Sequence, residues 1–136
     1  MLIVVDPQSD VPVYRQLMKQ IEFLIASGQL RPGDELPSTR TLSAQLGVNP
    51  MTISKAYSYL ERDEVLERRP GRPLIVKAFD AGQLQIRRTD LLRQGLAPIV
   101  TMVRQLDVDD EEALRIFRGM LDESSAPALD EEEAQR

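Results

Sequence analysis

Apolar residues recur at helical spacing in three stretches of the first 60 residues. One stripe runs from about residue 12 to 27, and a shorter one pairs Leu42 with Leu46. In the third stretch, apolar residues follow one another at i, i+3, i+4 and i+7. This spacing places side chains on one face of a helix. The pattern therefore predicts three helices, each turning one face toward a shared core. The third stripe consists of Ile53, Ala56, Tyr57 and Leu60.

Signals for helix ends separate the second and third helices. Ser38 is a candidate N-cap, and Gly47 stands where a helix commonly ends in a left-handed residue. Asn49 then supplies a second N-cap, followed by Pro50 at the first helical position. We expect helices over 38–46 and from residue 50 onward, joined as a helix-turn-helix that points to DNA. Capped helix pairs also occur in many all-helical domains that never touch nucleic acid.

A basic hairpin is predicted directly after the third helix. Residues 65–68 and 74–77 read as short strands, and the Pro-Gly turn between them covers 69–73. Arg68, Arg69 and Arg72 lie at its tip. A basic hairpin in this position is typical of the wing of a winged helix-turn-helix, which reaches DNA phosphates or the minor groove. An arginine-rich turn found alone is more often a solvated loop.

Charge is distributed in a way that fits a local DNA-binding surface. No acidic residue occurs from Leu36 through Leu60, whereas Arg40 and Lys55 are present, so phosphates can approach without repulsion between like charges. Residues 1–79 carry ten basic and nine acidic side chains. Residues 80–136 carry seven and thirteen, which together give the net charge of −5. A negative total argues against a nonspecific nucleic-acid coat and favours a specific, salt-sensitive site.

Composition narrows the function classes further. The chain has no cysteine and no histidine, which excludes zinc fingers, thiol redox centres and the common nucleophilic catalytic sites. We expect no enzyme, no cofactor and no metal site. The opening residues lack the pattern of a signal peptide and no stretch is apolar enough for a bilayer, so we expect a soluble cytoplasmic protein without membrane contact. Residues 2–5 are expected to form a short strand or a dimer strap.

The residues after the wing carry two further apolar stripes. The first, between Gln83 and Leu106, has spacings of four, three, four and three, which is the pattern of a helix that pairs with another helix. Gly95 and Pro98 interrupt it, so we expect a kink or break near 95–98 and two pieces rather than one long helix. The second stripe belongs to a helix that Asp109 caps and that ends near Leu121. The candidate interface residues are Leu92, Leu96, Ile99, Val103, Leu106, Leu114, Phe117 and Leu121.

Two stripes in so short a segment are difficult for one small domain to cover, and self-association would cover them. The alternative is an intramolecular bundle that packs back on the winged helix. A homodimer would read an inverted repeat with two recognition helices about 34 Å apart. We therefore expect a winged helix-turn-helix over 1–79, a helical dimerisation segment over 80–123 and a disordered acidic tail over 124–136. The fold class is mainly α with a small β wing.

The residues around the predicted helix-turn-helix resemble the GntR family of bacterial transcription regulators. The resemblance spans about residues 10–77 and is carried by the run 28–42, by 46–49, and by Thr52, 56–57 and 60–61. The opening residues 6–9 and 12–16, with the short C-terminal segment, are most similar to the YtrA-like branch, which often accompanies transporter genes. The resemblance implies a DNA-binding regulator and favours a homodimer.

The family resemblance also nominates site residues. In the family, the start of the second helix contacts DNA and the start of the third reads base edges. Met51 has no hydrogen-bonding side chain, so its base readout is limited to a thymine methyl. Readout is expected to depend most on Arg40, Asn49 and Thr52. The candidate DNA-binding residues are Ser38, Thr39, Arg40, Asn49, Pro50, Met51, Thr52, Lys55, Arg69, Gly71 and Arg72.

The sequence departs from the family pattern in two places. Glu64 stands where the family usually has glycine after the third helix, and Pro73 stiffens the wing and removes an N–H. We expect a dimeric transcription regulator that acts as a repressor on an inverted-repeat operator. The alternative is a winged-helix protein-interaction module. If a small-molecule effector acts, the cleft between the C-terminal helices and the winged helix is where we expect it.

Overall fold

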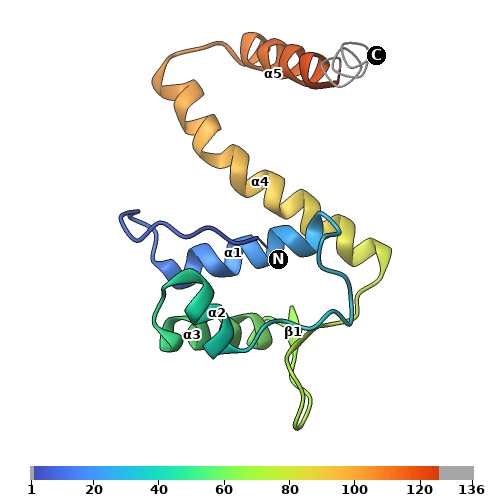
Figure 1. The fold of residues 1–136 in the computed structure, drawn as a ribbon. Helices are drawn as coiled ribbons and strands as arrows, with labels where there is room; N and C mark the ends of the chain where they lie inside the picture. Colours follow the sequence, from blue (N-terminus) through green and yellow to red (C-terminus); the bar gives the residue numbers. More distant parts are fainter. Residues whose placement is uncertain (1, 126–136) are drawn as a thin grey trace, which may run out of the picture. The chain divides into compact units, whose positions relative to one another are not determined.

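The computed structural model describes residues 2–125, and its element order agrees with the mainly helical fold expected from the sequence (Figure 1). Two short strands follow the third helix. Residues 126–136, most of the predicted disordered tail, lie outside the described residues, whereas Ser124 and Ser125 end the last helix. The elements are α1 Val13–Ala26, α2 Thr39–Leu46, α3 Pro50–Arg62, β1 Leu66–Glu67, β2 Ile75–Val76, α4 Ala81–Gln105 and α5 Asp110–Ser125.

The chain divides into two compact units after Leu91. The first unit holds α1 to α3, the hairpin and the beginning of α4, and the second holds the rest of α4 and α5. The start of α4 is attached to α1, because Arg88 Nε donates a hydrogen bond to the carbonyl oxygen of Ala26 across 2.8 Å. No helix in the described part of the chain is long and apolar enough to cross a bilayer.

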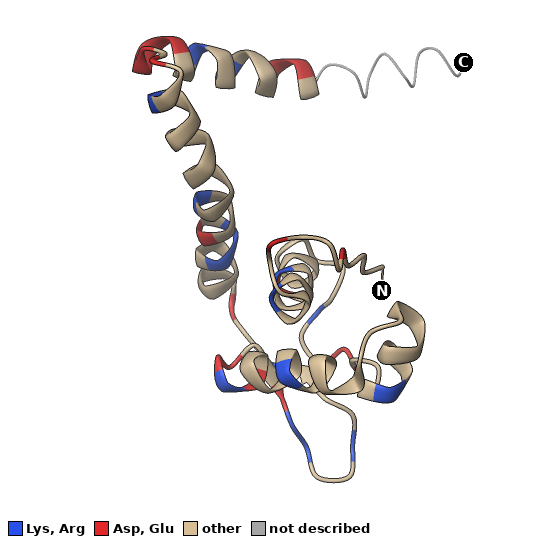
Figure 2. Cartoon of the chain, turned by 90° about the vertical axis from the view of Figure 1, so that its left-hand side faces the viewer, with Lys and Arg blue, Asp and Glu red and all other residues tan. Residues whose placement is uncertain are grey.

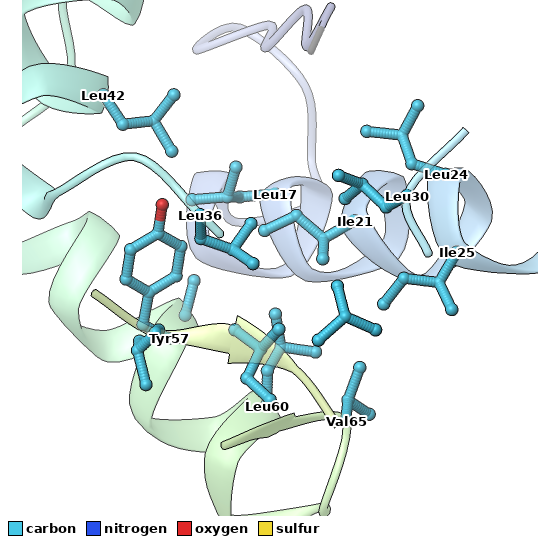
Figure 3. Packing of buried hydrophobic residues seen from close by; sticks show 14 of the residues in the cluster. Leu17, Ile21, Leu24, Ile25, Leu30, Leu36, Leu42, Tyr57, Leu60 and Val65 are labelled. Carbon is cyan, nitrogen blue, oxygen red and sulfur yellow. The ribbon is translucent and has the colours of Figure 1, made fainter. Parts of the chain in front are cut away.

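The core of the first unit is built from the stripes that the sequence pattern predicts (Figure 3). α3 packs against α1, α2 and β1. β1 and β2 close the core as an antiparallel pair in which Leu66 faces Val76. The largest fully buried side chains come from all of these elements, and this shared burial fixes the orientation of α3. They are Leu17, Ile21, Ile25, Leu42, Ile53, Leu60, Leu66 and Val76.

Residues 2–5 form no strand, so the first of the two expectations for this segment is wrong. Ile3 enters the core, and two glutamines on neighbouring turns of α1 bind the backbone of this segment. The side-chain amide of Gln20 both accepts from the N–H of Val4 and donates to its carbonyl. Gln16 does the same for Asp6 across 2.8 Å in each direction. Side chains thus satisfy backbone groups that a strand partner would otherwise satisfy.

The end of α3 shows how the chain accommodates Glu64 at the family's glycine position. Glu64 has a φ of 61°, in the left-handed region where the backbone of residues other than glycine is strained. Its carboxylate lies 3.0 Å from the Nζ of Lys77. The departure from the family pattern therefore leaves the turn in place and gives it a less favourable backbone conformation.

The expected break in the first C-terminal helix is wrong, because α4 continues from Ala81 to Gln105 with Pro98 inside it (Figure 1). Proline removes the hydrogen bond to the carbonyl of Gln94. Both residues are exposed, so water can bind that carbonyl and the helix can continue. α5 begins after Asp109 as expected and extends four residues beyond Leu121. Arg104 and Asp110 form an ion pair of 2.5 Å between the two helices.

Candidate DNA-binding surface

The start of α2 carries the first group of predicted contact residues. Ser38 caps the helix, and its Oγ accepts a hydrogen bond from the N–H of Thr41 across 3.1 Å. Thr39 is half-buried, and Arg40 is exposed. Arg40 takes part in none of the ion pairs found among residues 2–125. Its guanidinium is therefore available to an external anion.

The start of α3 carries the second group, and here the structure restricts the expected chemistry. The Oδ1 of Asn49 accepts from the N–H of Met51 across 2.8 Å, so the side-chain oxygen caps the helix. An asparagine needs both its oxygen and its nitrogen for bidentate recognition of adenine. The cap uses one lone pair of this oxygen and fixes its direction, so the NH₂ group is the part of Asn49 that the helix end leaves free for a base. Met51 projects from the same turn with 78% of its surface exposed.

The turn between α2 and α3 has the geometry that its sequence predicts. Gly47 adopts φ 66° and ψ 33°, the left-handed conformation that ends α2. Tyr57, in the middle of α3, is buried and donates a hydrogen bond from its hydroxyl to the carbonyl oxygen of Pro37 across 2.8 Å. Burial raises the pKa of Tyr57 well above its ordinary value of 10. The Gly47 turn joins the end of α2 to α3, and the Tyr57 hydrogen bond attaches the middle of α3 to the residue that precedes the cap of α2.

The hairpin carries basic residues on both of its arms (Figure 2). Arg68 Nε lies 3.1 Å from a carboxylate oxygen of Glu61 on α3, and Arg69 lies 3.8 Å from Glu67. Arg72 takes part in none of the ion pairs of the described residues. Gly71 has a φ of 68°, which permits the tight turn over 69–72, where the N–H of Arg72 donates to the carbonyl oxygen of Arg69. The wing arginines therefore differ in availability, and Arg72 is the one without an acidic partner in this part of the chain.

The sequence pattern did not reveal a stack of side chains beside α3, the helix expected to read the DNA bases. Tyr14 falls within the apolar stripe predicted over residues 12–27, and Lys55 falls outside the apolar stripe of the third helix. In the structure the Nζ of Lys55 lies 4.1 Å from the ring centroid of Tyr14. Tyr59 contacts the same ring with centroids 5.6 Å apart. The spacing of Lys55 and Tyr59 by one helical turn was a visible signal, but the partner from α1 was not.

Seven of the eight predicted interface residues lie on α4 and α5, and Leu106 directly follows α4. The single chain leaves them largely uncovered. Leu96 and Val103 are half-buried, and the other six are exposed. No residue of α4 or α5 is buried. Further apolar residues on these helices are also exposed, so the uncovered surface is wider than the predicted seam. They include Val100, Met102, Ile116 and Met120.

Three helices with a turn between the last two, followed by an antiparallel hairpin, define the first unit as a winged helix-turn-helix domain. The family model for bacterial regulatory proteins of the gntR family matches residues 13–76. The HTH-type transcriptional repressor YtrA of Bacillus subtilis (strain 168) is 34% identical over 108 residues, covering 79% of this chain and 78% of that protein. The uncharacterized HTH-type transcriptional regulator YhcF of the same organism is 36% identical over 107 residues, covering 79% and 88%.

Solved structures resemble the chain beyond the winged helix. A GntR family transcriptional regulator from Listeria monocytogenes has a TM-score of 0.74 at 26% identity, covering 85% of this chain and 98% of that one. YtrA from Sulfolobus acidocaldarius, a GntR-family transcription factor, has a TM-score of 0.55 at 37% identity, covering 71% and 100%. The chain belongs to the GntR family of transcriptional regulators, and its similarity to YtrA confirms the expected branch. These relatives are regulators and not enzymes.

Proposed function

We propose that this regulator is a repressor that binds an inverted-repeat DNA operator as a homodimer. The observation that carries the proposal is the combination of the winged helix-turn-helix with an acid-free stretch from Leu36 to Leu60. Arg40 and Lys55 lie exposed on this stretch, and neither is engaged in an ion pair of the described residues. A protein-interaction module has no need to keep such a surface free of carboxylates.

Repression is supported by the relatives. YtrA and NagR of Bacillus subtilis are both named transcriptional repressors, and this chain is 34% and 30% identical to them. A protein that occupies an operator can hinder polymerase by excluded volume alone. The short C-terminal segment of this chain then has to do no more than hold two winged helices at the right spacing.

The homodimer is supported by the uncovered apolar surface of α4 and α5. Large exposed apolar patches on a soluble protein mark interaction sites. A twofold symmetric pair would bury the same surface of each chain and would present two α3 helices to successive major grooves, about 34 Å apart. Symmetry in the protein then requires an inverted repeat in the operator.

The test is to select, from genomic DNA, the fragments that the protein binds. Purified full-length protein is mixed with sheared DNA from the source organism at moderate salt, and the bound fragments are sequenced. We expect an enriched inverted repeat. Arg40→Ala should weaken binding to that repeat by about 1–3 kcal/mol, the range for a base or buried phosphate contact. Arg93→Ala, which removes an exposed arginine on α4, is the matched control and should bind like the wild type.

Each outcome bears on a different part of the proposal. Enrichment of direct or single sites would contradict the symmetric dimer. Enrichment that survives Arg40→Ala would remove this residue from the site. If the wild type enriches no sequence, the repressor function is wrong and the protein-interaction alternative takes its place.

A further inference from the structure

A stack of four side chains joins the recognition helix to the first helix. The ammonium of Lys55 lies 4.1 Å from the ring centroid of Tyr14, and the rings of Tyr14 and Tyr59 lie 5.6 Å apart with 50° between their planes. At the other end, the guanidinium carbon of Arg62 lies 4.5 Å from the ring of Tyr59. Two cations therefore enclose two aromatic rings in one continuous row.

The row follows from the geometry of α3. Lys55, Tyr59 and Arg62 are spaced at i, i+4 and i+7, so they lie on the same side of the helix. Tyr14 comes from the first turn of α1, which packs against α3. Both tyrosines are half-buried, and both cations are exposed. The rings are thus fixed by packing, while the charges remain accessible.

The two cations differ in what else they contact. Arg62 Nε lies 3.3 Å from a carboxylate oxygen of Asp63, so its charge already has a partner. Lys55 takes part in none of the ion pairs of residues 2–125. Because the ring of Tyr14 contacts one side of the ammonium, the remaining donors of Lys55 can point away from the protein.

An aromatic ring beneath a lysine reduces the side-chain entropy that the lysine loses when it binds an anion. A free lysine side chain loses much rotamer entropy when it binds a phosphate. A lysine that already rests on an aromatic face has lost part of that freedom in the unbound protein, so less is lost on binding. The attraction between an ammonium and a tyrosine ring is strong enough to bias the rotamer at an exposed site.

We propose that Tyr14 is a positioning residue for DNA binding, whose ring holds the ammonium of Lys55 in place for a DNA phosphate. This inference rests on the proposed function. It assigns the role to the ring and not to the hydroxyl, whose contact is with Arg15 Nε across 3.3 Å at the surface. Tyr14→Phe should therefore keep the role, and Tyr14→Leu should lose it.

The test has two parts: NMR of the unbound protein, and affinity measurements on the operator that the genomic selection recovers. In the unbound protein, the ring current of Tyr14 should shift the NMR signals of the Lys55 ε-methylene upfield. The shift should persist in Tyr14→Phe and vanish in Tyr14→Leu. Tyr14 also packs against the core, so its substitution could affect folding. Unfolding curves therefore have to show that each variant folds.

Operator affinity is then measured in a double-mutant cycle. Tyr14→Leu should weaken binding about two- to fivefold, the size expected for a cation–π contact at an exposed site. Tyr14→Phe should bind like the wild type. In a Lys55→Met background, Tyr14→Leu should have no further effect, because the cation that the ring positions is already absent.

An equal loss from Tyr14→Leu in both backgrounds would show that the ring supports the fold and does not act through Lys55. An absent ring-current shift, or unchanged affinity in Tyr14→Leu, would also overturn the inference while leaving the proposed function intact. If the wild-type protein binds no DNA, the proposed function fails and the positioning role fails with it.

Discussion

The hydroxyl of Tyr57 donates a hydrogen bond to the carbonyl oxygen of Pro37 across 2.8 Å. Pro37 directly precedes Ser38, the N-cap of α2, and Tyr57 lies two turns into α3. The bond therefore connects the helix that carries Arg40 with the helix that carries Lys55. Because Tyr57 is buried, this contact also limits how far the segment before α2 can move relative to α3.

Tyr57→Phe should destabilise the protein by about 0.5–1.5 kcal/mol, because the carbonyl of Pro37 loses its partner while the ring still fills the core. The free energy of unfolding in urea measures the loss. Tyr59→Phe removes a hydroxyl that makes none of the hydrogen bonds found in the described part of the chain, so it should change stability less. Equal effects of the two variants would contradict this prediction.

Tyr57 should also make stability depend on alkaline pH. Burial raises the pKa of Tyr57 in the folded state above the value of about 10 that it has in the unfolded chain. The stability that the neutral hydroxyl contributes is complete below pH 10 and is lost as the pH rises toward the folded pKa. The wild type should lose stability above pH 10 more steeply than Tyr57→Phe. Parallel curves of stability against pH for the two proteins would mean that ionisation of Tyr57 is not linked to unfolding.

Glu64→Gly should stabilise the protein by about 0.5–1 kcal/mol. The substitution relieves a left-handed φ of 61°, and this gain exceeds the loss of the exposed contact with Lys77. Asp63→Gly is the matched control, since Asp63 has an ordinary φ of −80°, so that glycine there relieves no strain and adds freedom to the unfolded chain. We expect thermal melting to move upward for Glu64→Gly and downward for Asp63→Gly. A downward shift for both would mean that Glu64 is not strained.

Glu22→Gln should stabilise the protein at neutral pH by less than about 1 kcal/mol, because the carboxyl is only half-buried. Burial, followed by the charge of Asp63, raises the pKa of Glu22, although Arg87 and Lys19 oppose the shift. The protonated carboxyl is thus favoured in the folded state, and its contribution is lost as the pH rises through the folded pKa. Urea unfolding measures the difference in stability between Glu22→Gln and the wild type, and this difference should shrink below about pH 4. A difference that stays constant with pH would mean that the charge of Glu22 is not the cause.

Arg72→Ala should weaken DNA binding by a similar factor on every DNA sequence and should reduce the salt dependence by about one phosphate contact. Arg72 has no acidic partner among the described residues, whereas Arg68 is paired with Glu61. Arg68→Ala should therefore change the salt dependence less. Fluorescence anisotropy over a series of salt concentrations gives the slopes. A loss confined to the specific operator would instead indicate that Arg72 reads bases.

Ile99→Asp should dissociate the proposed homodimer, because it would bury an unpaired charge in the interface. Sedimentation equilibrium would then give the mass of one chain. Thr101→Asp, at an exposed polar position two residues away on α4, is the control and should leave the mass of the assembly unchanged. If Ile99→Asp still sediments as a dimer, the interface lies elsewhere.

Local features of this fold could be predicted because each depends on a few neighbouring residues. The cap at Ser38, the left-handed Gly47 and the start of α3 at Pro50 all agree with the structure to within one residue. Glu64 could be identified as a departure from the family, but its positive φ shows that the surrounding packing imposes the turn. Pro98 shows the reverse, because a local rule predicted a break and the helix continues.

The sequence by itself determined the class of this protein: three amphipathic helices, a capped helix-turn-helix and a basic hairpin. Spacing and caps are short-range properties, and they can be read one element at a time. The tertiary structure decided which side chains meet, such as Tyr57 with Pro37 and Tyr14 with Lys55. These pairs lie 20 and 41 residues apart in the chain. Only the packing of α1, α2 and α3 around one core brings them together, because no local pattern encodes contacts between elements.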